Sequence, residues 1–540
     1  MIGAAALSLT LAACGGQEAP GKPKPVVKLD PTQLAAKQEI VRGNGAEPQS
    51  LDPHKMSGTI EAQILRDLLE GLVNSAPDGS TVPAVAKNWD TKDNKTFIFH
   101  LRHDARWSNG DPVTAHDFVY SWRRLVNPAT ASPYAWYLPA DKVKNADAIV
   151  HGKKSPDTLG VEALDDYTFK VELEQPVAYF VDTLVHNSVA PVHKASIEKY
   201  GEEWTRPGHF VGNGAYKLSK WVVNERIELV RNDKYWDNAH TRLNKVTYLP
   251  IPSANAELSR YLAGEIDMTY SVPAEQAKRI RTEFPGQLRT VPYIGTYYYE
   301  FNTRRAPFDN VDVRKALAYA INRDIIAYKV IGLGQKPAYT LTPEAVKNFT
   351  PPKTQWAQWS QEQREQKARE LYAKAGYSKD HPLKLKLLYN TDDNHRKIAI
   401  AVAAMWKLAL GVQVTLENQE WKSYLSTLDE GNFDVTRYAW IGDYNEPSTM
   451  LKVLLTGGGS NHARYANSEY DALLSQSTSE ANPADRAKYY ARAEELLARD
   501  MPIMPIYQYV TQHVVKPYVG GYPENPLDYQ YSKDMWIIKH

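Results

Sequence analysis

Residues 436–450, TRYAWIGDYNEPSTM, carry two opposite charges at a spacing that could serve chemistry. Arg437 and Asp443 stand six positions apart, and the residues between them are aromatic, apolar or small. Six extended residues span about 20 Å, which is too far for the two charges to contact each other. The stretch is therefore a catalytic site, a place where each charge has a structural partner elsewhere, or a clamp for a ligand that carries both charges.

Motifs of common enzyme classes are missing from the sequence. There is no G-x-x-x-x-G-K-[ST] phosphate loop, no H-E-x-x-H zinc motif and no G-x-S-x-G nucleophile motif. The 14 histidines include no pair at ligand spacing on a helix face. Acidic residues are plentiful, but none is marked out as a hydrolytic pair. These absences favour a binding protein over an enzyme, with no cofactor and no metal.

Strands and helices alternate along the chain that must position these residues. Strands are predicted at 95–102, 168–173, 245–251, 289–293, 383–389, 412–417 and 503–510, with two more joined by a turn within 215–230. Helices are predicted at 114–126, 312–321, 361–375, 396–410 and 485–500. This order indicates α/β lobes, and a length of 540 residues predicts two or three domains.

The composition is that of an ordinary globular protein, with 43% hydrophobic and 24% charged residues. A formal net charge of +1 indicates no nucleic-acid partner. The unusual numbers are 34 Tyr and 13 Trp. Such rings suit a binding surface, and they also suit a large tyrosine-rich sheet.

The N-terminus contains the single cysteine, Cys14. Residues 1–13 have the apolar character of a signal peptide and are too short to span a bilayer. Residues 11–14, LAAC, resemble a lipobox, so we expect Cys14 to be lipidated and residues 14–37 to form a flexible tether. With no second cysteine, the mature protein has no disulfide and no cysteine-based metal site.

Two long stretches resemble a known family. Residues 96–122, TFIFHLRHDARWSNGDPVTAHDFVYSW, and residues 301–326, FNTRRAPFDNVDVRKALAYAINRDII, are similar to signature blocks of the family 5 solute-binding proteins of ABC peptide importers. Shorter matches include NQEW at 418–421 and DYNEP at 443–447. The resemblance extends over residues 38–540.

The resemblance implies an α/β fold of the three-domain periplasmic-binding-protein type, a Venus flytrap of type II, cluster C, with mixed β-sheets. Domain I is expected to comprise residues 38–58, 186–294 and 511–540, domain II residues 59–185, and domain III residues 295–510. A ligand would lie between domains I and III, and closure would shield it from water.

Roles for the charged residues follow from the same resemblance. Asp443 matches the acid that pairs with a peptide α-ammonium, because a buried cation needs a counter-ion. Arg437 and His395 match groups that receive the C-terminal carboxylate, and Glu300 matches another acid nearby. Structural alternatives remain open: a turn acid for Asp443, an ion pair for Arg437, a helix start for His395 and a purely structural role for Glu300.

The resemblance also implies which uncharged groups would form the walls of the binding site. The backbone of Ala439, Trp440 and Ile441, followed by Gly442, would pair with the peptide as an added strand that tolerates any side chains. Aromatic side chains would line roomy, hydrated pockets: Trp421, Trp440, Tyr298 and Tyr509. Trp421 is alternatively a core residue.

The chain departs from the family pattern at several places. The best-known relatives carry a cysteine pair at the positions of Gly295 and Ile441, so here that wall must hold by packing alone. A lysine expected near Ile331 is absent, and Pro48 has no N–H to offer a ligand. These departures leave the preferred peptide length open.

We therefore predict a lipid-anchored binding protein on the periplasmic or extracytoplasmic side of a bacterial cell envelope. It would be a monomer that captures oligopeptides of roughly two to five residues and delivers them to the permease subunits of an ABC importer. The alternatives are a binding protein for cell-wall (murein) peptides, a receptor or chaperone that uses the same pocket, and a surface peptidase or glycosidase.

Overall fold

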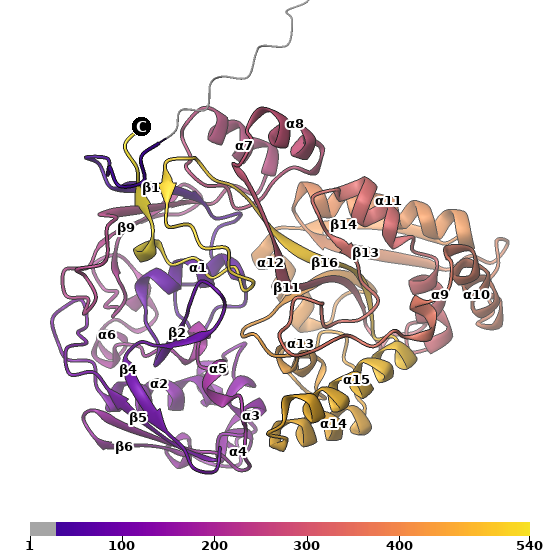
Figure 1. Cartoon of the computed structure of the whole chain (residues 1–540). Helices are drawn as coiled ribbons and strands as arrows, with labels where there is room; N and C mark the ends of the chain where they lie inside the picture. The colour runs from indigo at the N-terminus through magenta and orange to yellow at the C-terminus, as the bar shows by residue number, and fades with distance from the viewer. Residues whose placement is uncertain (1–28) are drawn as a thin grey trace, which may run out of the picture.

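The computed structural model describes residues 29–540, so the predicted signal peptide, Cys14 and most of the tether lie outside the described residues. Two long strands, β11 (Leu288–Phe301) and β16 (Ile503–Val514), join two lobes (Figure 1). The first lobe comprises residues 29–287 and 515–540, and the second lobe comprises residues 302–502.

The first lobe contains two four-stranded sheets and a small hairpin. One sheet has the order β1–β10–β9–β8, with β1 parallel to β10, and the other is the antiparallel sheet β4–β5–β7–β6. The strands are β1 (Glu39–Gly43), β2 (Val73–Ser75), β3 (Thr81–Pro83), β4 (Ala86–Asp90), β5 (Thr96–Leu101), β6 (Val161–Asp165), β7 (Thr168–Glu172), β8 (Tyr216–Val222), β9 (Arg226–Arg231) and β10 (Lys245–Leu249).

Short α-helices accompany these sheets in the first lobe. They are α1 (Thr59–Leu68), α2 (Ala115–Val126), α3 (Tyr137–Ala140), α4 (Ala146–Val150), α5 (Phe180–Thr183), α6 (Lys194–Tyr200), α7 (Ala254–Leu262) and α8 (Ala277–Glu283). A capping contact begins α2, because the Thr114 backbone N–H donates to Asp117 Oδ2 over 2.8 Å. Its buried face, which includes Phe118 and Trp122, lies against β6 and β7.

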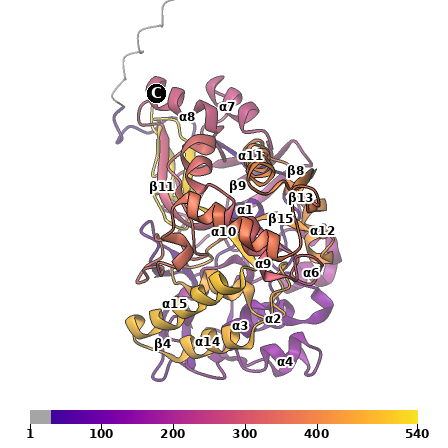
Figure 2. The same cartoon turned by 90° about the vertical axis from the view of Figure 1, so that its right-hand side faces the viewer.

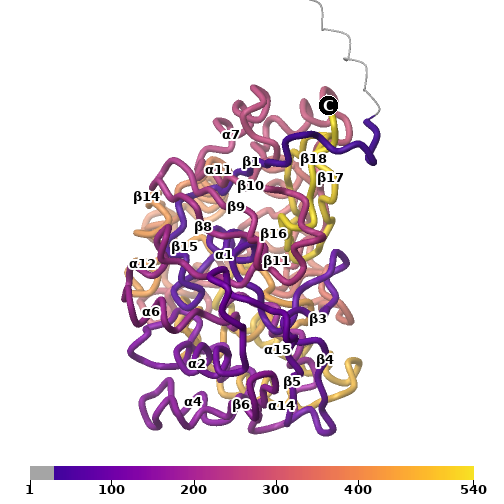
Figure 3. Tube along the Cα trace, turned by 90° about the vertical axis from the view of Figure 1, so that its left-hand side faces the viewer, coloured from indigo at the N-terminus to yellow at the C-terminus, as the bar shows by residue number. Residues whose placement is uncertain are grey.

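The C-terminal residues return to the first lobe. Strands β17 (Val519–Gly520) and β18 (Trp536–Ile537) lie beside its N-terminal strand (Figure 3). The Ala35 N–H donates to the Ile537 carbonyl over 2.9 Å, and Arg42 Nη2 donates to Gln530 Oε1 over 3.0 Å. Both ends of the described chain therefore belong to one lobe.

The second lobe is built on a mixed six-stranded sheet of order β12–β16–β11–β15–β13–β14. Helices α9, α10 and α11 cover its outer side, and α14 and α15 pack together at one end (Figure 2). The elements not yet given are β12 (Lys336–Pro337), β13 (Lys384–Asn390), β14 (Gln413–Gln419), β15 (Val435–Ile441), α9 (Val311–Tyr319), α10 (Gln361–Lys374), α11 (Asp393–Leu410), α12 (Trp421–Glu430), α13 (Ser448–Leu451), α14 (Ser468–Ser479) and α15 (Pro483–Asp500).

Two elements differ in extent from the prediction. The strand predicted at 289–293 continues to Phe301, because the buried run YYYEF pairs with both β15 and β16. The helix predicted from residue 396 begins at Asp393, because Asp392 caps it by accepting from the N–H groups of Asn394 and His395. The earlier start places Asn394 and His395 in the first turn of α11.

Candidate functional site

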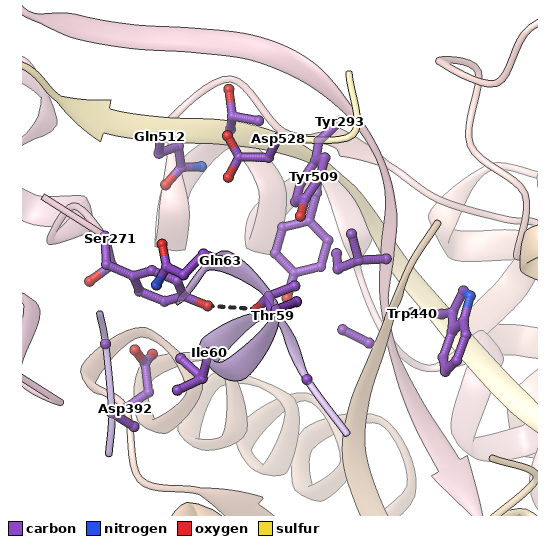
Figure 4. Close-up of a pocket in the computed structure, with 18 of the residues that line it drawn as sticks. Thr59, Ile60, Gln63, Ser271, Tyr293, Asp392, Trp440, Tyr509, Gln512 and Asp528 are labelled. Atoms are coloured by element: carbon purple, nitrogen blue, oxygen red, sulfur yellow. Dashed lines mark hydrogen bonds between the residues drawn. The ribbon is translucent and has the colours of Figure 1, made fainter. Parts of the chain in front are cut away.

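A cavity of about 520 Å³ lies between the two lobes. Strand β15, strand β16 and the start of α11 line it from one side, and α1 with its preceding loop lines it from the other. Figure 4 shows Thr59 and Gln63 of α1, Tyr509 and Gln512 of β16 and Trp440 of β15 around this space. The volume is within the range of about 300–1,000 Å³ that is usual for small-molecule sites.

Strand β15 carries the stretch TRYAWI and offers an open edge. On one side it pairs with β11 along its whole length, from Val435↔Phe301 to Ile441↔Gly295. On the other side β13 pairs only with Val435 and Thr436. Residues 437–441 therefore have no strand partner on that side within the described chain. Their β-branched and aromatic side chains favour the extended backbone that such an edge needs.

Asp443 is a buried acid that forms no ion pair with a lysine or arginine of the described chain. Its side chain is 9% exposed, and its Oδ1 lies 3.3 Å from His186 Nε2 of the first lobe. Burial raises the pKa of Asp443 well above its ordinary value, with the nearby Asp141 charge adding to the rise. A carboxylate in this setting is stabilised by a cation that enters the cavity.

His186 is neutral and orients the Asp443 carboxylate. Burial lowers the pKa of His186 to about 3. Its Nδ1 accepts from the Ser188 backbone N–H over 3.3 Å, which leaves the ring hydrogen on Nε2. The Nε2–H therefore points to Asp443 Oδ1, and the second carboxylate oxygen remains for a ligand.

Arg437 is a buried cation with no carboxylate partner in residues 29–540. Its Nη1 donates to Asn390 Oδ1 over 3.1 Å and its Nη2 donates to Tyr509 Oη over 2.7 Å. The guanidinium carbon lies 4.8 Å from the centre of the Tyr297 ring. These neighbours hold the guanidinium in place without neutralising it, so an anion in the cavity would complete its environment.

His395 lies in the first turn of α11 and also lines the cavity. Burial, together with the Arg437 charge, lowers the pKa of His395 well below its ordinary value. Its Nδ1 has no hydrogen-bond partner among the described residues. His395 is thus a neutral group beside Arg437, available for a hydrogen bond rather than for a second ion pair.

The wall at Gly295 and Ile441 is closed by packing. The two residues are register partners in the β11–β15 ladder, and a Cβ on Gly295 would lie 2.5 Å from Ile441 Cδ1. At the next position the Gly442 N–H donates to the Ile294 carbonyl over 2.7 Å. The Ile441 side chain thus occupies the space where a pair of cysteines is expected in relatives.

Most of the predicted site residues line the cavity. They are Arg437, Ala439, Trp440, Ile441, Gly442, Asp443, His395, Trp421 and Tyr509.

Two predicted site residues, Glu300 and Tyr298, do not line the cavity. Both are fully buried on strand β11, where Tyr298 packs against Tyr438. Glu300 Oε2 lies 3.6 Å from His462 Nδ1. Burial lowers the pKa of His462, but the carboxylates of Asp429 and Glu300 outweigh burial and raise it to about 9. Glu300 therefore has a cationic partner inside the second lobe.

Several lining residues were not anticipated from the sequence. His186, Tyr134, Tyr270 and Asp528 come from the first lobe, and Asp392 comes from the cap of α11. No local pattern marks the first four, because they reach the cavity only through contacts between distant segments. Asp392 carried a signal, since an Asp immediately before a helix is a preferred N-cap.

Residues 29–540 contain no group of three or more His, Cys, Asp or Glu residues that could hold a metal ion. Over the same range, no helix is both long and apolar enough to cross a membrane. The arrangement that remains is two buried, opposite charges at the ends of an open strand edge.

Known proteins share this architecture. The curated relatives include the periplasmic oligopeptide-binding protein OppA of Salmonella typhimurium, 51% identical over 94% of both chains, and the periplasmic murein peptide-binding protein MppA of Escherichia coli, 49% identical over 94% of this chain and 95% of the relative. Both relatives are named as binding proteins, which agrees with the prediction that the chain is not an enzyme.

Solved structures agree with the predicted α/β fold and its mixed sheets. The chain superposes on the murein tripeptide-binding protein MppA of Escherichia coli with a TM-score of 0.93 at 49% identity, covering 94% of this chain and all of that one. For Haemophilus influenzae OppA in complex with RPPGFSPFR the TM-score is 0.91 at 47% identity, with the same coverage. For the unliganded open form of MppA the TM-score is only 0.68 at 49% identity, covering 94% of this chain and 99% of that one.

The family assignment rests on a long match. The pattern described as bacterial extracellular solute-binding proteins, family 5 Middle, matches residues 80–462. This range includes β15, Arg437 and Asp443. Together with relatives of about 50% identity along almost the whole chain, the match confirms the predicted resemblance. The chain belongs to the family 5 bacterial extracellular solute-binding proteins.

Proposed function

We propose that this protein captures oligopeptides between its two lobes and delivers them to an ABC importer. One observation carries the proposal: Asp443 and Arg437 are buried, neither forms an ion pair with a charged side chain of residues 29–540, and they stand at the two ends of the open β15 edge. A peptide supplies an ammonium, a carboxylate and a backbone between them.

Each part of a peptide has a complementary group in the cavity. The α-ammonium pairs with Asp443, and the C-terminal carboxylate accepts from the Arg437 guanidinium, with His395 as a further hydrogen-bonding group. The backbone of residues 439–441 pairs with the peptide backbone as an added strand. Main-chain pairing ignores side-chain identity, so the same site accepts many sequences.

Isothermal titration calorimetry with tri-alanine tests this function directly. We expect binding of the free peptide and strongly reduced binding of the N-acetylated and C-amidated forms, because each modification removes one charge. Native mass spectrometry of the protein, purified without refolding, should show co-purified peptides. Equal binding of the acetylated and free peptides would contradict the role of Asp443.

A murein tripeptide is the second candidate ligand. The chain superposes with a TM-score of 0.93 on a protein named for binding that ligand, which is the observation that favours it. Titration with murein tripeptide beside tri-alanine separates the two candidates. A much higher affinity for murein tripeptide would assign the protein to cell-wall peptide uptake, and similar affinities would support general oligopeptide capture.

The cellular setting is part of the proposal. Two relatives are named as periplasmic proteins, which supports a place outside the cytoplasm. Lipidation at Cys14 would tether the protein to a membrane, and the permease subunits of the importer would receive the peptide. Metabolic labelling with a palmitate analogue tests the anchor: wild type should be labelled and Cys14→Ser should not.

A further inference from the structure

A buried ion pair joins the two lobes at residues that the proposed peptide contacts do not include. Lys452 Nζ donates to Asp141 Oδ1 over 2.7 Å, and the two side chains are 4% and 2% exposed. The second oxygen of Asp141 has no partner among the described residues. Burial of two charges at this depth is costly, because each ion loses its hydration.

The two ions come from different lobes. Asp141 follows α3 in the first lobe, and Lys452 follows α13 in the second. The Lys452 ammonium also lies 5.1 Å from the ring centre of Tyr179 in the first lobe and 5.9 Å from that of Tyr444 in the second. The structure superposes far better on one form of MppA than on its unliganded open form, with TM-scores of 0.93 and 0.68. Moving the lobes apart would separate this pair.

The ion pair of Asp141 and Lys452 lies next to Asp443. Asp141, Lys452 and Asp443 line one narrow gap together with Tyr137 and Tyr444, and this gap has no room for a water molecule. Burial and the Asp141 charge raise the pKa of Asp443, and the Lys452 charge opposes this rise. Two carboxylates and one ammonium leave a net charge of −1, which a single peptide ammonium cancels.

We propose that Asp141 and Lys452 are positioning residues of the amine subsite, which form an ion pair only when the lobes close and thereby couple closure to the capture of the peptide ammonium. The inference rests on the proposed peptide-binding function. In the open protein both ions are hydrated. In the closed protein Lys452 neutralises Asp141, so that Asp443 keeps its charge for the ligand.

Removing one ion alone should harm closure more than removing both. Without Lys452, two carboxylates share a dry gap and one of them must take up a proton or the lobes must stay apart. Without the Asp141 charge, Lys452 is free to pair with Asp443 and competes with the peptide ammonium. When both charges are gone, Asp443 again faces the ligand alone.

The test compares Lys452→Met, Asp141→Asn and the double variant with wild type by calorimetric titration of tri-alanine. Lys488→Met is the matched control, because its ion pair with Asp485 has a lysine side chain that is 78% exposed. We expect each single variant at the buried pair to lose about tenfold or more in affinity, the control to lose about twofold or less, and the double variant to regain part of the loss.

Small-angle X-ray scattering supplies a second readout. At a tri-alanine concentration that contracts wild type and Lys488→Met, the single variants at the buried pair should remain expanded. Single variants that bind like the control, or a double variant that is weaker than both singles, would overturn the ion-pair proposal. Wild type that binds no peptide at all would instead overturn the proposed function. Melting temperatures of the ligand-free variants establish that each is folded. If Lys452→Met does not fold, the affinity of Asp141→Asn tests the proposal.

Discussion

At the scale of single residues, burial without a partner defines this site. Asp443 contacts the neutral ring of His186, and Arg437 is held by the uncharged groups of Asn390 and Tyr509. Residue type and spacing along β15 were enough to predict that Arg437 and Asp443 do not contact each other. His186 could not be predicted in this way, because about 250 residues separate it from Asp443 along the chain.

Replacing Asp443 by alanine should remove the counter-ion of the peptide ammonium. We expect a loss of about 2–5 kcal/mol of binding free energy for tri-alanine, because the ammonium would stay buried and unpaired. Calorimetry on wild type and Asp443→Ala, each with free and N-acetylated tri-alanine, forms a double-mutant cycle. If the affinity losses from Asp443→Ala and from N-acetylation simply add, the peptide amine does not contact Asp443.

Peptide affinity should decrease at both low and high pH. In the peptide-free closed protein burial raises the pKa of Asp443, and in the complex the ammonium keeps the carboxylate ionised, so affinity falls as pH drops through the peptide-free pKa. Above about pH 8 the peptide amine loses its proton and affinity falls again. Titrations across this range should give a bell-shaped profile, and Asp443→Asn should abolish its acidic limb. A flat wild-type profile would contradict this assignment.

At the scale of elements, the junction of β11 and β15 fixes the wall of the cavity. The sequence pattern predicted only residues 289–293 of β11, and the resemblance implied the pairing edge of residues 439–441, but neither predicted that β11 runs for 14 residues between two partners. The length of β11 depends on neighbours that are distant in sequence, and local pattern contains no information on them. At the Gly295–Ile441 end of the β11–β15 ladder, a Cβ added to Gly295 would lie 2.5 Å from Ile441 Cδ1, so the two strands are tightly packed there.

Gly442→Ala should destabilise this junction. Its Cβ would lie 2.5 Å from Ile294 Cγ2, so the strands must shift, at a cost of about 1–3 kcal/mol in the free energy of unfolding. Gly71→Ala is the matched control, because its Cβ would meet nothing nearer than 3.4 Å. Urea titration followed by tryptophan fluorescence measures both. A smaller cost of Gly442→Ala in an Ile294→Ala background, where Cγ2 is absent, would identify the clash as its cause, and equal stability of Gly442→Ala and Gly71→Ala would rule it out.

At the scale of the whole molecule, the lobes meet along a surface of mixed polarity. Tyr529 Oη of the first lobe donates to the Asp443 carbonyl over 2.8 Å, and Gln175 Nε2 donates to the Ser475 carbonyl over 3.0 Å. The family resemblance predicted the fold class, whereas these contacts depend on how the surfaces of the two lobes come together. The pairing of Asp141 with Lys452 belongs to the same category, since neither residue stands in a family motif.

Peptide binding should contract the molecule and stabilise it. We expect the radius of gyration from small-angle scattering to decrease when tri-alanine is added. At a free peptide concentration 100 times the Kd, the gain in stability should be about 2.7 kcal/mol, visible as a higher melting temperature. Asp443→Ala should show neither change at the same peptide concentration. An unchanged radius at saturation would mean that binding does not close the lobes.

The two long strands β11 and β16 restrict how the lobes can move. They are the only covalent links between the lobes in residues 29–540, and they pair with each other with a register shift between Pro292 and Thr296. A paired ribbon resists sliding along its length, because sliding would break its ladder of hydrogen bonds. It bends readily across its flat face. The ribbon thus allows easy bending in one direction only, which rotates one lobe about a single axis. Each closure of the lobes would therefore bring the β15 edge back to the same position against the first lobe.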